Sequence, residues 1–184
     1  MLHLLRMKKI AFFLSANDLV KKYTDPSLEL VKLSVEAGYG FVYGGTNVGL
    51  MRQSAEVVES LHGNITAISS KEFSHKLRAG ADECTIAEDL SERKRLFLQK
   101  SDAIIALPGG VGTLDEVTEA IEKKKLGIFQ KPIALLNIDG FWNGLRDQIN
   151  HMHTEGFAPY SFEDMCFSSD SPHEIFVYLQ KELR

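Results

Sequence analysis

The sequence predicts an α/β fold in which a parallel sheet carries helices on both faces. Short apolar runs such as residues 103–107 and 132–138 are typical of strands that are buried on both sides. Segments with helical spacing alternate with these runs, which is the pattern of β-α units. Two glycine-rich turns, at residues 44–49 and 109–112, each stand between an apolar run and a helical segment. Ligands of such sheets bind beyond the carboxyl ends of the strands, so both turns are candidate binding sites.

The first half of the chain contains four of the expected strands. Residues 8–14 and 39–43 are apolar and strand-like, and the spacing of apolar residues predicts helices over 26–37, ended by Gly38, and over 50–61. Residues 64–69 and the short run 84–87 are the next expected strands. The polar segment between them, residues 70–83, shows no firm period, so no element is predicted there.

The second half repeats the alternation. A helix over residues 90–100 precedes the strand 103–107, and a further helix is expected from a Thr113 cap as far as Lys125. The strand 132–138, a helix over 141–153, a possible edge strand at 165–167 and a closing helix over 171–183 complete the order.

Composition indicates one ordinary globular domain. The chain has 184 residues, of which 44% are apolar and 25% charged, and this length fits a single domain, expected over residues 7–184. The apolar run within residues 1–6 is too short for a signal peptide. These residues are interpreted as a leader outside the domain.

Charge and cysteine content narrow the expected surroundings of the protein. A formal net charge of −4 gives no general attraction to nucleic acid, and no apolar stretch is long enough to predict a membrane span. Cys84 and Cys166 are the only cysteines and lie far apart in the sequence. They do not form a disulfide framework, so a reducing cytoplasm is the expected location.

The junction from Leu107 to Glu116 is the strongest functional signal. Gly109, Gly110 and Gly112 provide backbone that can lie close to a ligand, and Thr113 stands where the next helix is expected to begin. The first N–H groups of a helix lack internal acceptors and carry its positive dipole end. The junction therefore predicts a phosphate-binding turn.

Glu116 and Arg93 have both functional and ordinary interpretations. The run Thr113 to Glu116 matches a capping box, in which the glutamate only returns a hydrogen bond to the cap residue. Alternatively, a carboxylate one turn from bound phosphate can stabilise the oxocarbenium-like charge of a glycosidic cleavage or orient the attacking water. Arg93 lies in a charged run that is most often solvated, or it binds phosphate or ribose oxygens.

The second glycine turn adds Gly44, Gly45, Thr46 and Asn47 as candidate ligand contacts, although Thr46 and Asn47 can also simply close their own turn. Other motifs are missing from the sequence. The dinucleotide fingerprint fits poorly, no P-loop is present, and His151 and His153 diverge on their helix, so no metal site or cofactor is expected.

These motifs together resemble the LOG family of cytokinin riboside 5′-monophosphate phosphoribohydrolases, whose relatives have often been labelled lysine decarboxylases. The resemblance rests on Pro108 to Glu116, which matches P-G-G-x-G-T-x-x-E, on Glu92-Arg93-Lys94, on Tyr43 to Met51 and on Lys131 to Asn137. It extends over about residues 8–157.

The resemblance implies a Rossmann-like fold and a homodimer with active sites near the subunit interface. It also implies hydrolysis of a purine nucleoside 5′-monophosphate, AMP or an N6-modified relative, to free base and ribose 5-phosphate. Arg93 and Glu116 are then the catalytic pair. Gly109, Gly110, Gly112 and Thr113 hold phosphate, and Lys94 is expected to contact the substrate as well.

The chain departs from the family pattern around the expected base and ribose contacts. It has Phe13-Leu14-Ser15-Ala16 after the first strand, Thr46 in place of a third glycine, Arg52 after Met51, and Ser91 before Glu92. These changes leave a second hypothesis open, in which the protein carries a nucleotide or molybdenum cofactor without turnover. The retained Arg93 and Glu116 favour the enzyme.

Overall fold

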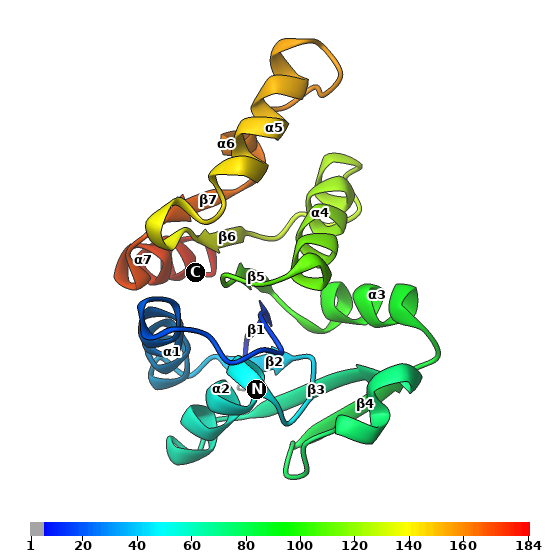
Figure 1. Ribbon diagram of the computed structural model, residues 1–184, viewed down its shortest axis with the longest axis vertical. Coiled ribbons are helices and arrows are strands. Elements are labelled where there is room, and N and C mark those ends of the chain that lie inside the picture. Colours follow the sequence, from blue (N-terminus) through cyan, green and yellow to red (C-terminus); the bar gives the residue numbers. More distant parts are fainter. Residues whose placement is uncertain (1–5) are drawn as a thin grey trace, which may run out of the picture.

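The computed structural model describes residues 6–184, and its elements alternate as the sequence predicts (Figure 1). The strands are β1 (Lys9–Phe13), β2 (Gly40–Tyr43), β3 (Ile65–Ser70), β4 (Glu83–Ala87), β5 (Ala103–Ala106), β6 (Ile133–Leu136) and β7 (Phe167–Ser169). The α-helices are α1 (Lys21–Glu36), α2 (Gly49–Ser60), α3 (Leu90–Lys100), α4 (Val111–Lys125), α5 (Asn143–Thr154), α6 (Phe162–Met165) and α7 (Pro172–Glu182). Two short 3₁₀ helices are η1 (Lys71–Lys76) and η2 (Ile138–Gly140). The leader expected over residues 1–6 lies, apart from Arg6, outside the described residues.

The strands form one parallel seven-stranded sheet in the order β4-β3-β2-β1-β5-β6-β7. The chain builds outward from β1 to β4 and then returns to the centre, where β5 pairs with β1 through the register Ala11 to Ile104. The strand order therefore reverses between β1 and β5, which is the point where ligands bind in open α/β sheets.

Helices cover both faces of the sheet, and each face has its own apolar core. On one face α1, α2 and α7 pack against strand residues such as Phe12, Phe41 and Ile105. On the other, α3 and α4, with α5 and α6, pack against Phe13, Ile104 and Leu135. Because alternate residues of one strand point to opposite faces, a continuous apolar strand fills both cores. This is the predicted single-domain, Rossmann-like α/β fold.

Two helix starts differ from the sequence prediction. Helix α1 begins at Lys21 and contains Pro26, whereas the prediction began the helix at that proline. One missing proline N–H is tolerated here because α1 buries Thr24, Leu30 and Val31 against the sheet and α2. Helix α4 begins at Val111 with Gly110 as its N-cap, so the predicted Thr113 cap is wrong.

The remaining differences lie in the loops and at the sheet edge. The segment without a predicted element holds η1, and Leu77 just after it forms an isolated bridge with Thr46. The expected edge strand falls two residues later, as β7, because residues 162–165 form the short helix α6. Within residues 6–184, no helix combines the length and apolar character needed to cross a membrane.

Candidate active site

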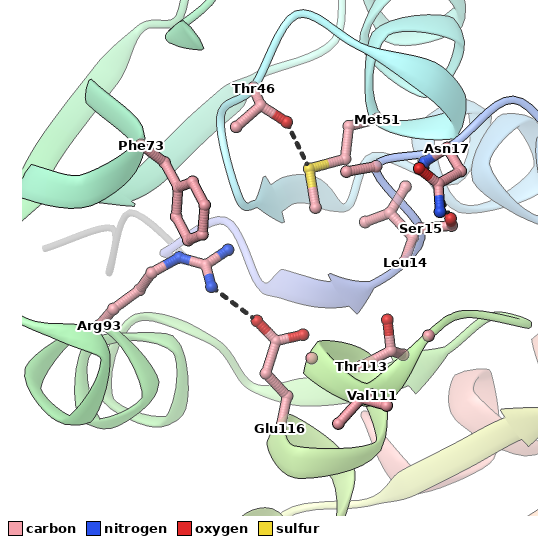
Figure 2. Close-up of a pocket in the computed structure, with 13 residues that line it drawn as sticks. Leu14, Ser15, Asn17, Thr46, Met51, Phe73, Arg93, Val111, Thr113 and Glu116 are labelled. Carbon is pink, nitrogen blue, oxygen red and sulfur yellow. Dashed lines mark hydrogen bonds and ion pairs between the residues drawn. The ribbon is translucent and has the colours of Figure 1, made fainter. Parts of the chain in front are cut away.

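A cavity of about 320 Å³ lies at the carboxyl ends of the central strands, where the strand order reverses. Its lining comes from the loop after β1, the second glycine turn with α2, η1, α3 and the start of α4. Figure 2 draws these side chains, which are Leu14, Ser15, Ala16, Asn17, Thr46, Met51, Phe73, Arg93, Gly110, Val111, Gly112, Thr113 and Glu116. The volume is at the lower end of the range for small-molecule sites, about 300–1,000 Å³.

The start of α4 presents main-chain donors to this cavity. The first hydrogen bond within the helix joins the Leu114 N–H to the Gly110 carbonyl at 3.0 Å. The N–H groups of Val111, Gly112 and Thr113 therefore have no acceptor inside the helix. A Cβ on Gly109 would lie 2.3 Å from Thr113 Oγ1, so glycine at this position lets the turn close against Thr113. The predicted phosphate turn has the geometry of an anion site.

Arg93 and Glu116 meet in the cavity wall. Arg93 Nη1 donates to Glu116 Oε1 at 3.0 Å, and both residues are buried, with exposed fractions of 9% and 7%. Arg93 comes from the first turn of α3, where its Nε also donates to the Ile68 carbonyl at the end of β3. Its guanidinium carbon lies 5.0 Å from the centre of the Phe97 ring. The carboxylate thus faces a fixed guanidinium, whereas the capping box proposed for it does not form.

Burial changes the ionisation of Glu116. Loss of solvent raises its pKa to about 7, an effect that the neighbouring positive charge of Arg93 only partly offsets. A carboxyl group with such a pKa exchanges its proton near neutral pH, which suits general acid–base chemistry.

The cavity has two chemically different ends. In Figure 2, Glu116 lies between Thr113, one helical turn before it, and the guanidinium of Arg93. The ring of Phe73 lies beside the guanidinium of Arg93, and the side chain of Met51 lies across the cavity from Glu116. One end is therefore lined by backbone donors, and the other by an aromatic ring and a thioether.

The sequence-predicted residues are only partly brought together. Gly110, Gly112, Thr113, Thr46, Arg93 and Glu116 line the cavity, whereas Gly44, Gly45, Asn47, Lys94 and Gly109 are outside its lining. Lys94 instead pairs with Asp115 and Glu119 on α4, and the Asn47 side chain accepts a hydrogen bond from Arg78.

Several lining residues were missed by the sequence interpretation. Asn17 follows the central strand β1, a position that topology alone could have singled out. Phe73 is the aromatic residue of the polar segment after β3, and nothing in its local pattern indicated a site. Ser15 was noted only as a departure, and its hydroxyl accepts a hydrogen bond from the Asn17 N–H at 2.9 Å.

Fold and site define an α/β protein of the Rossmann-like class in which a helix start with unpaired N–H groups stands next to a buried carboxylate. The profile of the family described as "Possible lysine decarboxylase" matches residues 41–179. The chain is 34% identical to a protein of Oryza sativa subsp. japonica named "Probable cytokinin riboside 5′-monophosphate phosphoribohydrolase", over 96% of this chain and 73% of that one. It is 32% identical to a cytokinin riboside 5′-monophosphate phosphoribohydrolase of Arabidopsis thaliana, over 95% of this chain and 78% of that one. The chain belongs to the LOG family of phosphoribohydrolases.

Solved structures share the fold. A molybdenum cofactor binding protein of Rippkaea orientalis superposes with a TM-score of 0.75 at 21% identity, covering 98% of this chain and 99% of that one. The molybdenum cofactor carrier protein of Chlamydomonas reinhardtii gives a TM-score of 0.74 at 16% identity, covering 97% of this chain and 99% of that one. At such low identity these similarities establish the fold alone.

Proposed function

We propose that this protein hydrolyses the N-glycosidic bond of a purine nucleoside 5′-monophosphate, AMP or an N6-modified, cytokinin-type relative, giving the free base and ribose 5-phosphate. The observation that carries the proposal is the buried contact between Arg93 and Glu116. Glu116 lies one helical turn after the start of α4, where three N–H groups face the cavity. The relatives of this chain that are named as phosphoribohydrolases support the reaction class.

The two ends of the cavity give the nucleotide a direction. The 5′-phosphate binds at the N–H groups of Val111, Gly112 and Thr113, where the helix dipole favours an anion. The base extends toward Phe73 and Met51, whose apolar surfaces suit a flat heterocycle. The glycosidic bond then lies beside Glu116, because that residue is between the two ends.

In the proposed reaction, the C1′–N9 bond breaks with its electrons leaving on the base nitrogen. Positive charge develops on C1′ and the ring oxygen, and the Glu116 carboxylate stabilises it and orients the water that adds to C1′. The water supplies the hydroxyl of ribose 5-phosphate and the proton that the base acquires. Arg93 holds phosphate or ribose oxygens and keeps the carboxylate in place. No metal or cofactor takes part in the proposed steps.

The resemblance also leads us to propose a homodimer in solution, which light scattering on the purified protein tests directly. A monomer at assay concentrations that retains full activity would contradict this part.

Product release tests the reaction itself. Purified protein is incubated with AMP and with isopentenyl-AMP, and the base is separated by chromatography. We expect Glu116→Gln to lose turnover and to keep nucleotide binding, because Gln preserves the shape and still accepts a hydrogen bond from Arg93. Glu122→Gln is the matched control, since Glu122 is a carboxylate on the same helix α4 and lies outside the cavity lining. Binding without base release by the parent protein would refute the enzyme and favour a carrier.

A further inference from the structure

Arg93 uses only part of its guanidinium within the protein. Nε donates to the Ile68 carbonyl and Nη1 to Glu116, both at 3.0 Å. Among residues 6–184, Nη2 has no hydrogen-bond acceptor, and Arg93 lines the cavity. Nη2 is therefore the donor that remains for a ligand, and its position determines what Arg93 can bind.

Gly44, at the end of β2, provides the space that Nη2 occupies. A Cβ added to Gly44 would lie 2.4 Å from Nη2, far inside van der Waals contact. The φ angle of Gly44 is not positive, unlike that of Gly45 at +78°, so the backbone conformation does not require a glycine here. The close approach of the guanidinium is what requires it.

Arg93 cannot move aside without loss. Its two hydrogen bonds hold the guanidinium at two atoms, and the Phe97 ring packs against the guanidinium carbon. A displacement that frees space at Gly44 must stretch the bond to Ile68, the bond to Glu116, or both. A group that is usually flexible at its far end is here fixed on three sides.

Met51 closes the same space from the direction of α2. The Cβ added to Gly44 would also lie 3.0 Å from Met51 Cε and 3.1 Å from Met51 Sδ. Methionine side chains are normally adaptable, but Thr46 Oγ1 donates to Met51 Sδ at 3.0 Å, and both residues are buried. The dashed line between Thr46 and Met51 in Figure 2 marks this contact. Met51 is therefore held in place and does not readily make room for a side chain at position 44.

The rest of the second glycine turn is also engaged with protein. The Gly45 carbonyl accepts from the Arg78 N–H and the Asn47 N–H donates to the Lys76 carbonyl, each at 2.8 Å. Neither Gly44, Gly45 nor Asn47 lines the cavity. The hydrogen bonds of Gly45 and Asn47 therefore hold the turn against the end of η1 and the segment that follows it, and these two residues are not available to a ligand in the cavity.

We propose that Gly44 is a positioning residue for Arg93 and acts on the substrate through this guanidinium, not by binding phosphate itself. The proposal rests on the proposed function only in that Arg93 acts on the nucleotide; the placement of Arg93 by Gly44 can be tested without turnover.

A double-mutant cycle tests the placement. Gly44→Ala is made in the parent protein and in Arg93→Lys, which keeps a positive charge but has no Nη2, and thermal unfolding is measured for all four proteins. We expect Gly44→Ala to lower the Tm of the parent and to have a smaller effect in Arg93→Lys, where the contact with Nη2 is gone and only the contact with Met51 remains. The matched control is Gly144→Ala on α5, where an added Cβ has no neighbour within 4 Å. Equal loss in both backgrounds, or failure of Gly44→Ala to fold in both, overturns the proposal.

The titration of Glu116 gives a second readout. In protein labelled with ¹³C at the glutamate carboxyl groups, the Glu116 signal is the one missing from Glu116→Gln, and it is followed against pH without ligand. Arg93 lowers the pKa of this carboxyl, so displacement of the guanidinium in Gly44→Ala should raise that pKa above the parent value, with no change in Gly144→Ala. An unchanged titration in a folded Gly44→Ala protein refutes the placement.

Kinetics separate this proposal from the proposed function. If the parent releases base, kcat/KM of Gly44→Ala should fall about 100-fold, the loss typical of a catalytic group misplaced by about 1 Å, whereas Gly144→Ala should match the parent. A parent that releases no base refutes the proposed function, while the thermal cycle and the titration still decide the role of Gly44. Full activity in Gly44→Ala overturns the positioning role.

Discussion

Replacing Glu116 by Gln should remove a loss of stability that the parent protein undergoes as the pH rises to neutral, because the wild-type carboxyl is buried. The pKa of Glu116 in the folded protein is about 7, against an ordinary value of 4.5. A carboxyl with a raised pKa stabilises the fold only in its protonated form. Its contribution is fully present below about pH 4.5 and is lost as the pH rises through about 7.

The size of the effect follows from the distance between the two pKa values. At about 1.4 kcal/mol per pKa unit, that distance corresponds to about 3 kcal/mol of unfolding free energy. Gln cannot ionise, so Glu116→Gln does not lose this contribution and gains about 3 kcal/mol relative to the parent between acidic and mildly alkaline pH.

Urea unfolding measures this difference at a series of pH values, with the midpoint and slope fitted for each protein. Glu122→Gln is the control, because the Glu122 side chain on the same helix is about half exposed, at 53%, and its removal should produce no comparable trend over the same range. A constant difference between Glu116→Gln and the parent at all pH values would refute the inference that burial raises this pKa. A stability advantage of Glu116→Gln that shrinks with rising pH would mean that the folded protein lowers the pKa of Glu116 instead of raising it.

Other predictions concern catalysis, the glycine turn and the core. The kcat/KM for AMP should rise as the pH increases through about 7 and be lost below it, because the proposed reaction needs the Glu116 carboxylate; a pH–rate profile flat from acid to neutral contradicts this. Gly109→Ala should lower the Tm, since its Cβ would lie 2.3 Å from Thr113 Oγ1. Gly112→Ala, whose Cβ has no neighbour within 4 Å, should keep the Tm. Because Gly112 lines the cavity, the added methyl group should weaken phosphate binding in calorimetry. The reverse order of the two Tm values would show that the turn is not packed this way. Ile105→Ala, fully buried between β1 and β6, should reduce the unfolding free energy by about 2–5 kcal/mol in urea titrations, and a loss under about 1 kcal/mol would contradict a close-packed core.

Much of the fold could be predicted from the sequence because buried parallel strands have a local signature. The apolar runs around Ala103 and Ile133 are continuous, and glycine turns mark where such runs end. The structure confirms the order of the strands and their alternation with helices. Helix starts were less predictable, because they depend on partners far along the chain. Pro26 stays inside α1 since the helix packs on the sheet and α2, a stabilisation that local propensity does not reveal.

The site shows the same division. The main-chain donors at the start of α4 could be predicted, since they follow from the glycine turn and the helix that comes after it. That Arg93 contacts Glu116 depends on how α3 and α4 lie on one face of the sheet, and the run Glu92 to Arg95 gives no local sign of which basic residue points inward. Phe73 is in the cavity because the bridge between Thr46 and Leu77 holds the end of η1 near the second glycine turn, a contact across about thirty residues that no short pattern encodes.

The different construction of the two cavity ends bears on how enzymes of this kind can diversify. In the proposed complex, main-chain N–H groups at the start of α4 bind the phosphate, so this recognition tolerates side-chain replacements that keep Gly112 and the shape of the turn. The opposite end depends on η1, a surface segment in which no residue is buried, so replacements at Phe73 leave both apolar cores intact. Substitutions in this one short exposed segment can therefore change which base is bound, while the proposed phosphate contacts at the start of α4 stay the same.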